Sequence, residues 1–341
     1  MSRPTITRRG VLGAVAGLTA AVLVGCSSGS PAGNATVAPT GAATATSGGA
    51  AAPAELTKIS VGIIPIIDVA PIYLGVDKGF FAEEGLELTL EAGQGGAAIV
   101  PGVTSGSLQF GFSNTTSLLI ANSRGLDLKV VANGASTTGE SDNDFGAVLV
   151  KPDSPIQSAA DLGGKKIAVN TLNNIQTTTI NNQIREAGGD PTGTQYVELA
   201  FPDIVPAVER GDVDAGQVVE PFRTIGLSSE MRSVGSNYAT TDPNLVIAMY
   251  FTTKDYAEKN PEIVEGFTTA MNKSLEFAEA NPDEARAILG TYTKIDDAVK
   301  TDAVLPKWTP EINRNGVQVL ADLGQQDGLF ETAPSLDDLL P

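Results

Sequence analysis

The chain has 341 residues, with 22 Lys and Arg against 40 Asp and Glu and a formal net charge of −18. This acidic excess disfavours nucleic acid and anionic lipid surfaces as partners. The sequence holds no histidine and a single cysteine, which excludes Ser/His/Asp and Cys/His catalysis, histidine or thiolate metal sites and internal disulfides, so no metal and no cofactor is expected.

The first 25 residues have the composition of a signal peptide. They carry three arginines and no acidic residue, and they end in the apolar run 11–25. This run of 15 residues is too short for a membrane-spanning helix, which needs ~20 apolar residues. The segment 7–12, TRRGVL, resembles a twin-arginine export signal. We therefore predict that residues 1–25 direct export.

The only cysteine, Cys26, ends the segment LVGC, which resembles the bacterial lipobox whose cysteine becomes acylated. A buried structural cysteine is the alternative, but the small neighbours Gly25 and Ser27 offer nothing to bury it. Residues 27–54 have no charged and no aromatic side chain, so they cannot bury enough apolar surface to become ordered. As a flexible coil they would reach about 30 Å. Residues 26–56 are thus predicted to tether an extracytoplasmic body to the cell membrane through a lipid on Cys26.

Strands and helices are expected to alternate in the next part of the chain. Leu86, Leu88 and Leu90 alternate with polar residues, which is the period of a strand. The expected strands lie at 58–64, 86–90, 108–112 and 128–132, and the expected helices lie at 71–77, after the glycines at 93–96 and after the polar cluster at 113–116. Such alternation predicts a parallel sheet.

The same order of elements begins again after residue 165. Strands are expected at 166–169, 196–199 and 215–219 and a helix at 173–187. Residues 99–111 match residues 204–216 at six of thirteen positions, which predicts a structural repeat at an offset of 105 residues.

No third unit of this kind follows. The tail contains an apolar run at 245–252 and a long amphipathic helix at 260–279, and we expect it to fold back on the first unit. The chain would then cross between two lobes near 135–145 and near 240–244. The predicted domains are residues 57–145 plus 245–341 for lobe 1 and residues 146–244 for lobe 2.

Several motifs occur in one order along the chain. They are PIYLGVDKGFFAEEGL at 71–86, GQGG at 93–96, GSLQFG at 106–111, DLGGK at 161–165, GDVDA at 211–215 and EPF at 220–222. In this order they resemble the periplasmic binding proteins of the aliphatic sulfonate, nitrate, taurine and thiamine-pyrimidine group, over residues 58–287. The resemblance implies an α/β fold, a two-lobed clamshell of type II in which each lobe is a mostly parallel sheet flanked by helices. It also implies a protein that closes on a small molecule and delivers it to an ABC permease with its ATPase subunits. We expect this protein to be a monomer without enzyme activity.

The chain departs from parts of this group. Members that bind pyrimidine precursors tend to place His or Trp in the first pocket loop, which here is PIIDVA at 65–70. The relative that acts as a pyrimidine synthase consumes a histidine, which this chain lacks, so that activity is not expected.

Ligands of open α/β sheets bind beyond the carboxyl ends of parallel strands, where loops lead into helix N-termini. The residues expected to contact the ligand there are Asp68, Gln94, Gly95, Gly96, Ser113, Asn114, Thr115, Asn170, Thr171, Asn173, Phe201 and Glu220. Free N–H groups at helix starts, with hydroxyl and amide groups beside them, can hydrogen-bond a polar or anionic ligand. The Ser, Thr and Asn residues are also ordinary helix caps, so both interpretations stay open.

Two carboxylates decide which ligand is favoured. Asp68 and Glu220 each follow an expected strand end and could project into the cleft from opposite lobes, although a capping or surface role is the alternative. A sulfonate would be repelled by them unless Lys or Arg intervened, and the expected pocket loops contain neither. If both carboxylates face the ligand, a neutral or cationic nitrogenous solute is favoured, with Phe201 either stacked on its ring or part of the core. The resemblance itself implies a small polar organic molecule, which is a sulfonate, a nitrate-like or taurine-like solute or a pyrimidine-like solute.

Two other classes of function stay open. The first is an extracytoplasmic enzyme on the same scaffold that uses Asp68 or Glu220 as acid or base. The second is a ligand sensor that transports nothing. The sequence has no G-x-x-x-x-G-K-[ST] phosphate loop, so the chain is not the ATPase of a transporter.

Overall fold

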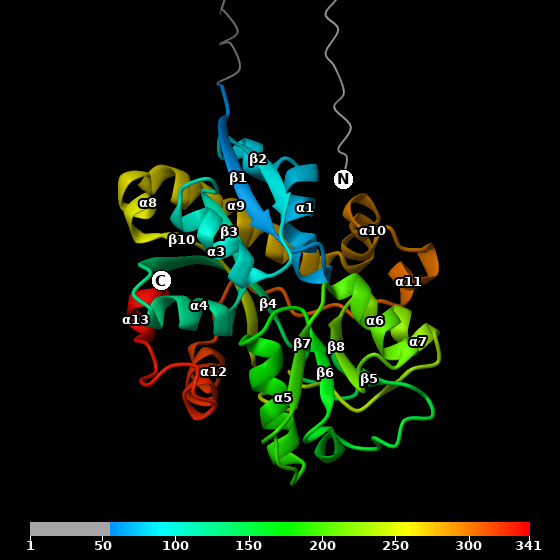
Figure 1. Cartoon of the computed structure of the whole chain (residues 1–341). Coiled ribbons are helices and arrows are strands. Elements are labelled where there is room, and N and C mark those ends of the chain that lie inside the picture. Colours follow the sequence, from blue (N-terminus) through cyan, green and yellow to red (C-terminus); the bar gives the residue numbers. More distant parts are fainter. Residues whose placement is uncertain (1–54) are drawn as a thin grey trace, which may run out of the picture. The chain divides into compact units, whose positions relative to one another are not determined.

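The computed structural model describes residues 55–341, so the predicted signal peptide, Cys26 and most of the tether lie outside the described residues. The described chain forms two sheets of five strands each, in the orders β2-β1-β3-β10-β4 and β7-β6-β8-β5-β9. Helices flank each sheet, and the two sheets with their helices form an upper and a lower body in Figure 1, which we call lobe 1 and lobe 2.

Lobe 1 contains the first sheet. Its elements are β1 (Thr57–Ile63), η1 (Ile67–Val69), α1 (Ala70–Asp77), α2 (Phe80–Glu83), β2 (Leu86–Ala92), α3 (Gly96–Thr104), β3 (Phe110–Asn114), α4 (Thr115–Ser123), β4 (Leu128–Ser136) and β10 (Val246–Thr253). After β10 the chain continues as a tail of α8 (Lys254–Lys259), α9 (Pro261–Ala280), α10 (Pro282–Tyr292), α11 (Asp297–Asp302), α12 (Arg314–Gln326) and α13 (Leu336–Leu339).

Lobe 2 contains the second sheet. Its elements are β5 (Gly146–Val150), η2 (Ala159–Leu162), β6 (Lys166–Val169), α5 (Ile175–Glu186), β7 (Gln195–Glu198), α6 (Phe201–Arg210), β8 (Ala215–Val219), α7 (Phe222–Ser228) and β9 (Arg232–Ser233).

The two sheets have the same plan. In each, one strand, β10 or β5, runs antiparallel to both of its neighbours, while the other recorded pairings are parallel. The predicted repeat is confirmed, because α3 with β3 and α6 with β8 lie at the expected offset and each helix contains a proline at the matching position, Pro101 or Pro206. The antiparallel strand β5 and the short β9 were not expected from the sequence.

Helix α9 shows why the tail folds back on lobe 1. Its buried side chains recur every three to four residues, with Phe267, Met271 and Leu275 among them, so one face is apolar. This face packs against α1 and the first sheet. A glycine, Gly75, allows the close approach of α1, because a Cβ at this position would lie 2.0 Å from the hydroxyl oxygen of Ser274. None of the helices in residues 55–341 has the length and apolar character needed to cross a membrane.

The tail also contacts lobe 2. Helix α12 packs against both α4 and α5. Just beyond it, the carboxylate of Asp327 accepts hydrogen bonds from Arg185 at 2.8 Å and from the side-chain amide of Asn181 at 2.9 Å. The last helices therefore hold the two lobes together at one side of the molecule.

The chain passes between the sheets twice, through residues 137–145 and residues 234–245, and one carboxylate joins these segments. Asp144, only 1% exposed, accepts from the Thr137 hydroxyl at 2.7 Å in the first crossing. It accepts from the Ser236 hydroxyl at 2.7 Å and the Ala239 amide at 3.1 Å in the second. Amides of Thr138 and Phe145 donate to its other oxygen. Asp144 thus fixes how the two crossing segments lie against each other.

We predict that Asp144→Asn destabilises the protein by about 2–4 kcal/mol, because the new amide group would face the Ala239 N–H and a charge-assisted bond would be lost. Urea unfolding at neutral pH measures this change. Asp142→Asn, an exposed carboxylate in the same loop, is the matched control and should change stability by less than about 0.5 kcal/mol. Equal effects of the two substitutions would contradict the assigned role of Asp144.

Candidate functional site

A cavity lies between the two lobes and has a volume of about 30 Å³. Its lining comes from both lobes and the second crossing segment: Ile64, Ile66, Asp68, Phe112, Asn114, Asn170, Asn174, Ile175, Gln176, Phe201, Val219, Tyr238, Ile247 and Ala248. We call it the interlobe cavity. It has room for a group about the size of a water molecule.

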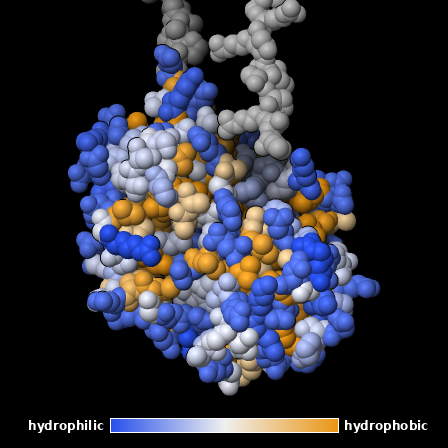
Figure 2. Space-filling model, viewed as in Figure 1, coloured by the Kyte–Doolittle hydropathy of each residue, from blue (hydrophilic) through white to orange (hydrophobic). Residues whose placement is uncertain are grey.

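An apolar hollow of about 230 Å³ adjoins this cavity and shares Ile64, Ile66 and Phe201 with it. Its remaining lining residues are Pro65, Gly93, Gln94, Ala200, Pro202 and Phe222. The rings of Phe201 and Phe222 are nearly parallel, 6.0 Å apart. Figure 2 shows a mostly hydrophilic face on which apolar side chains gather in patches, some of them where the two lobes of Figure 1 meet. The two hollows together approach the ~300 Å³ at which small-molecule sites begin.

The position of the cavity follows from the topology of the sheets. Strands β1, β3, β6 and β8 all point their carboxyl ends toward it, so the residues at or just after those ends, including Ile64, Asn114, Asn170 and Val219, meet there. This is the edge at which ligands bind in open α/β sheets.

Asp68 is the one ionisable carboxylate in the lining of the cavity, among the described residues. It lies in η1, directly after β1, and is 2% exposed. Its Oδ2 atom is buried and has no hydrogen-bond partner within residues 55–341, while its main-chain oxygen accepts from the Trp308 indole at 3.3 Å. Burial raises the pKa of Asp68 to about 8, and the negative charge of Asp144 adds to the rise.

Tyrosines surround this carboxyl group. Tyr238 lines the cavity, and Tyr250, on β10, has a buried hydroxyl without a partner in the described part of the chain. Burial raises the pKa of both hydroxyls, and the charge of Asp68 raises both further. The Tyr292 hydroxyl donates to the Ile66 carbonyl oxygen at 3.1 Å and holds the loop that leads into η1. Asp68 therefore sits in an aromatic environment that disfavours its own ionised form.

Lobe 2 faces Asp68 with neutral amides. The Asn174 side chain caps α5 by accepting from Gln176 and Thr177, and it donates to the Asn170 side-chain oxygen at 2.7 Å. The Gln176 side chain accepts from the Asn170 backbone N–H at 2.6 Å and donates to Gln217 on β8. This network orders the lobe 2 wall without adding a charge to it.

Direct contacts join the lobes around the cavity. Asn114, the cap of α4, accepts from the Ile175 N–H at 3.3 Å, and the Gln94 side chain donates to the Asn170 carbonyl at 3.4 Å. Gly95 lies so close to lobe 2 that a Cβ there would be 2.6 Å from the Thr171 methyl carbon. The structure thus shows the two lobes closed on each other.

Several residues expected to contact a ligand have local partners. The Ser113 hydroxyl donates to the Asn114 carbonyl, and the Thr115 hydroxyl donates to the Val246 carbonyl at 2.7 Å. Thr171 accepts from Asn174 at 2.9 Å. Asn173 is exposed, and its φ of 50° places it in the turn before α5. Ser113 also packs under Gly96, where a Cβ would lie 2.0 Å from the Ser113 hydroxyl oxygen.

Of the twelve expected residues, Asp68, Asn114, Asn170 and Phe201 line the interlobe cavity, and Gln94 lines the adjoining hollow.

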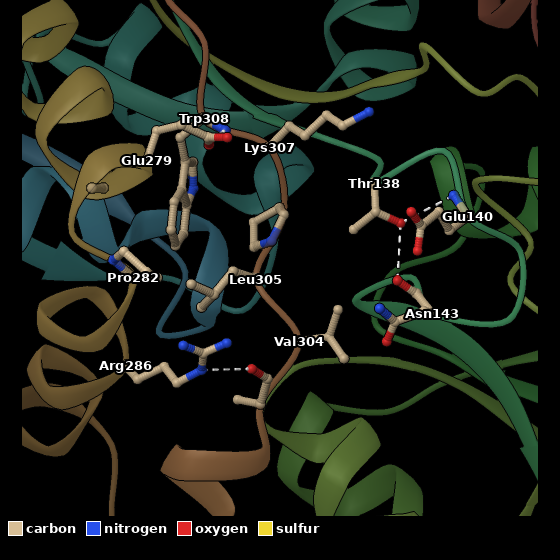
Figure 3. A pocket seen from close by; sticks show the side chains of 13 residues that line it. Thr138, Glu140, Asn143, Glu279, Pro282, Arg286, Val304, Leu305, Lys307 and Trp308 are labelled. Carbon is tan, nitrogen blue, oxygen red and sulfur yellow. Dashed lines mark hydrogen bonds between the residues drawn. The ribbon is translucent and has the colours of Figure 1, made fainter.

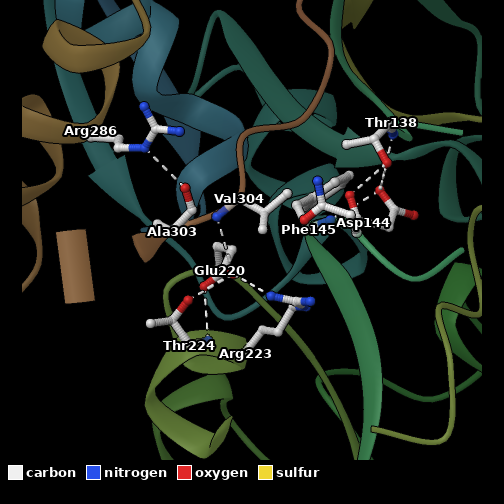
Figure 4. A network of polar contacts seen from close by, with 10 residues as sticks. Thr138, Asp144, Phe145, Glu220, Arg223, Thr224, Arg286, Ala303 and Val304 are labelled. Atoms are coloured by element: carbon white, nitrogen blue, oxygen red, sulfur yellow. Dashed lines mark hydrogen bonds and ion pairs between the residues drawn. The ribbon is translucent and has the colours of Figure 1, made fainter. Parts of the chain in front are cut away.

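Glu220 corrects the expectation that two carboxylates face each other across the cleft. Glu220 is 0% exposed and does not line the interlobe cavity. Its carboxylate accepts from the amide and the hydroxyl of Thr224, both at 3.0 Å, and pairs with Arg223 at 3.3 Å, so its lobe 2 partners lie in helix α7 (Figure 4). Burial raises the pKa of Glu220, and the Thr224 bonds and the Arg223 charge lower it.

Glu220 instead connects the lobes. Its carboxylate accepts from the Val304 N–H at 3.3 Å, in the tail segment 303–308, which we call the strap. Its carbonyl oxygen accepts from the Ile67 N–H at 3.0 Å, next to Asp68. Glu220, which was expected to bind ligand, therefore connects lobe 2 to lobe 1 through hydrogen bonds.

Larger hollows occur elsewhere on the described chain. One of about 420 Å³ lies between the strap and the first crossing segment, with Leu305 and Lys307 on one side and Thr138 and Asn143 on the other (Figure 3). Another of about 570 Å³ lies near α8, α9 and α13. Neither is lined by any of the described side chains that have a buried polar atom without a partner, whereas the interlobe cavity is lined by Asp68.

Sequence reasoning missed three polar residues of the interlobe cavity: Asn174, Gln176 and Tyr238. The cap of α5 is Asn174, one residue after the expected Asn173. Tyr238 lies in a crossing segment and follows no strand end, so no local signal marks it. Within residues 55–341 no group of three or more His, Cys, Asp or Glu side chains gathers to hold a metal ion.

Comparison with known proteins places this architecture in a family. The family model described as NMT1/THI5 like matches residues 66–285. The taurine-binding periplasmic protein of Escherichia coli (strain K12) is 29% identical over 212 residues, which cover 61% of this chain and 62% of that relative, less than two thirds of its length. The 4-amino-5-hydroxymethyl-2-methylpyrimidine phosphate synthase of Aspergillus parasiticus is 25% identical over 285 residues, 77% of this chain and 80% of the synthase.

A solved structure has the same fold. The alkanesulfonate-binding protein SsuA from Xanthomonas axonopodis pv. citri, bound to MOPS, superposes with a TM-score of 0.71 at 17% identity, covering 84% of this chain and 100% of that chain. The two-lobed α/β fold of periplasmic binding proteins, expected from the sequence motifs, is thereby confirmed.

The raised pKa of Asp68 predicts how stability depends on pH. Between about pH 4 and pH 8 the folded protein keeps a proton on Asp68 that the unfolded chain releases, so this group lowers stability as pH rises through that window. We expect Asp68→Asn to be more stable than the native protein, with an advantage that grows by about 2–4 kcal/mol from pH 5 to pH 8.

Urea unfolding of both proteins at pH 5, 6, 7 and 8 measures this difference. Glu87→Gln, at an exposed position of β2, is the control and should follow the native protein at every pH. A difference between Asp68→Asn and the native protein that stays constant with pH would show that Asp68 does not titrate in this range.

Proposed function

Because the chain belongs to the NMT1/THI5-like family, we propose that it is the extracytoplasmic solute-binding lipoprotein of an ABC importer. It captures a small polar organic molecule between its lobes and delivers this molecule to a membrane permease driven by ATPase subunits. The observation that carries the proposal is the cavity enclosed by both lobes, which has Asp68 among its lining residues, and one carboxyl oxygen of Asp68 is buried without a partner in the described chain. Similarity to taurine-binding and alkanesulfonate-binding proteins supports it.

The proposed lobes are residues 57–145 plus 245–341 and residues 146–244, and the protein works as a monomer. The proposed ligand contacts are Asp68, Asn114, Asn170 and Phe201, with Gln94, Gly95 and Gly96 closing the mouth. The lobe 2 amides of Asn174 and Gln176 extend this set.

Closure is the proposed mechanism. Ligand binds one lobe of an open form, and rotation about the crossing segments adds contacts from the other lobe, so the closed form is selected by its higher affinity. A difference of about 5.5 kcal/mol between the affinities for the closed and open forms turns a mostly open population into a mostly closed one, and the total of about 8 kcal/mol of a micromolar ligand is large enough to contain this difference. The permease then recognises the outer surface of the closed lobes.

A second candidate function is an enzyme on the same scaffold, which similarity to the phosphate synthase of Aspergillus parasiticus favours. Asp68, with a pKa of about 8 in an enclosed cavity, is the residue suited to act as its acid or base. Turnover of a bound compound that Asp68→Asn abolishes would establish this candidate, and binding without turnover supports capture and delivery. A sensor that uses the same closure would bind ligand but would not support uptake by a permease.

We predict that a ligand found by thermal-shift screening compacts the body of residues 57–341, because closure brings the two lobes together. Small-angle scattering with and without the compound measures the radius of gyration. A ligand of micromolar or better affinity that leaves this radius unchanged, starting from protein freed of copurified small molecules, would contradict closure. Mass spectrometry of the copurified molecules identifies the natural ligand.

We also predict that Cys26→Ser moves the protein from the membrane fraction to the soluble extracytoplasmic fraction, because the acyl chains on this residue are the proposed anchor. Cell fractionation followed by immunoblotting measures the distribution. Ser27→Ala, which keeps the cysteine, is the control and should stay with the membrane. Membrane retention of Cys26→Ser would remove the lipid anchor from the proposal.

A further inference from the structure

The charge balance of the interlobe cavity is unusual for a site that holds an anion. Among its described lining residues Asp68 is the only acidic side chain, and none is Lys or Arg. The nearby cation Arg223 is paired with Glu220 and does not line the cavity. An anionic group in this cavity would meet a carboxyl group and no compensating charge.

Once Asp68 is ionised, its unpaired Oδ2 atom requires a hydrogen-bond donor. It is buried, and no described residue donates to it. A charged N–H donor gives a carboxylate its strongest kind of hydrogen bond, about twice as strong as a neutral one. The aromatic side chains of Phe112, Phe201 and Tyr238 line the same cavity, and aromatic faces attract cations.

The shape of the two hollows indicates what such a donor is attached to. The cavity beside Asp68 is about 30 Å³, which suits a compact group such as an ammonium or one end of an amidinium. The adjoining hollow of about 230 Å³ is mainly apolar, with Phe201 and Phe222 in its wall. A molecule that fills both has a small polar head and an apolar or aromatic body.

We propose that the protein binds an organic cation, a protonated amine or amidine on an apolar or aromatic body, with Asp68 as the counter-charge and the Phe201 side of the cleft around the body. This inference rests on the proposed function of solute capture and names its ligand class. It separates this chain from relatives whose names state sulfonate binding, because a sulfonate head would have no cation to pair with here.

Binding of such a cation is expected to depend on pH. The titratable groups that face the Asp68 carboxyl are Asp144, Tyr238, Tyr250 and Tyr292, and none of them is a cation. Asp68 must lose its proton to pair with the ligand, so affinity should rise about tenfold per pH unit between pH 6 and 7 and level off near pH 8. A neutral or anionic ligand would not show this rise.

The test compares compounds of one shape and different charge: benzylamine, benzamidine, benzyl alcohol and benzenesulfonate, together with a wider panel of aromatic amines and amidines. Isothermal calorimetry on the intact body of residues 57–341 is run at pH 6, 7 and 8. Cations should bind with the stated pH dependence, and benzenesulfonate should not bind. Asp68→Asn should weaken cation binding about 100-fold and remove its pH dependence. Glu87→Gln should bind as the native protein does.

The outcomes separate the ligand class from the function. Binding of a sulfonate or a neutral compound that Asp68→Asn leaves unchanged, or the failure of every cation in the panel, overturns the cation proposal while solute capture stands. If compounds of every charge class fail to bind and to compact the protein, the proposed function itself fails. Because Asp68→Asn is expected to be the more stable protein, its loss of binding would not reflect unfolding.

Discussion

The main physical constraint on this molecule is the burial of a single carboxyl group between its lobes. Asp68 is enclosed by both lobes, has one oxygen without a partner in the described chain, and lies among tyrosines. Moving a carboxylate out of water without a partner is costly, so the folded protein keeps a proton on this group well above its ordinary pKa. The burial of the surrounding apolar side chains supplies the free energy that offsets this local cost. In the proposed function, this loss of stability accompanies the recognition of a ligand.

The enclosure of Asp68 depends on two other buried carboxylates that are fully bonded. Asp144 joins the two crossing segments, and Glu220 joins lobe 2 to the strap and to the loop before Asp68. Both oxygens of each of these two carboxylates accept hydrogen bonds, whereas Oδ2 of Asp68 has no partner in the described chain. Buried polar groups are normally hydrogen-bonded, so an exception requires a reason. We therefore assign structural roles to Asp144 and Glu220 and the proposed ligand contact to Asp68.

The fold alone does not determine which ligand a protein of this kind binds. The two sheets with their matching strand orders are shared with proteins whose names state taurine, alkanesulfonate and pyrimidine phosphate chemistry, so the scaffold serves several ligands. The side chains that can contact a ligand on such a scaffold lie at the carboxyl ends of the strands. In this chain those positions supply one carboxyl group, several amides and several aromatic rings, and no described lining residue there is a cation.

Local sequence patterns were enough to predict most of the strands and helices, the internal repeat and the edge of the sheets where the interlobe cavity lies, because periodicity and capping act within a few residues. Asp68, Asn114, Asn170 and Phe201 were identified in this way. The antiparallel strand β5, the contribution of Tyr238 and the direction in which Glu220 points were decided by the tertiary structure. Each of these depends on contacts between segments far apart in the chain, so no neighbouring residue signals it. Sequence alone located the two carboxylates after strand ends, and only the tertiary structure determined that Glu220 is bonded to α7 and the strap while one oxygen of Asp68 has no partner in the described chain.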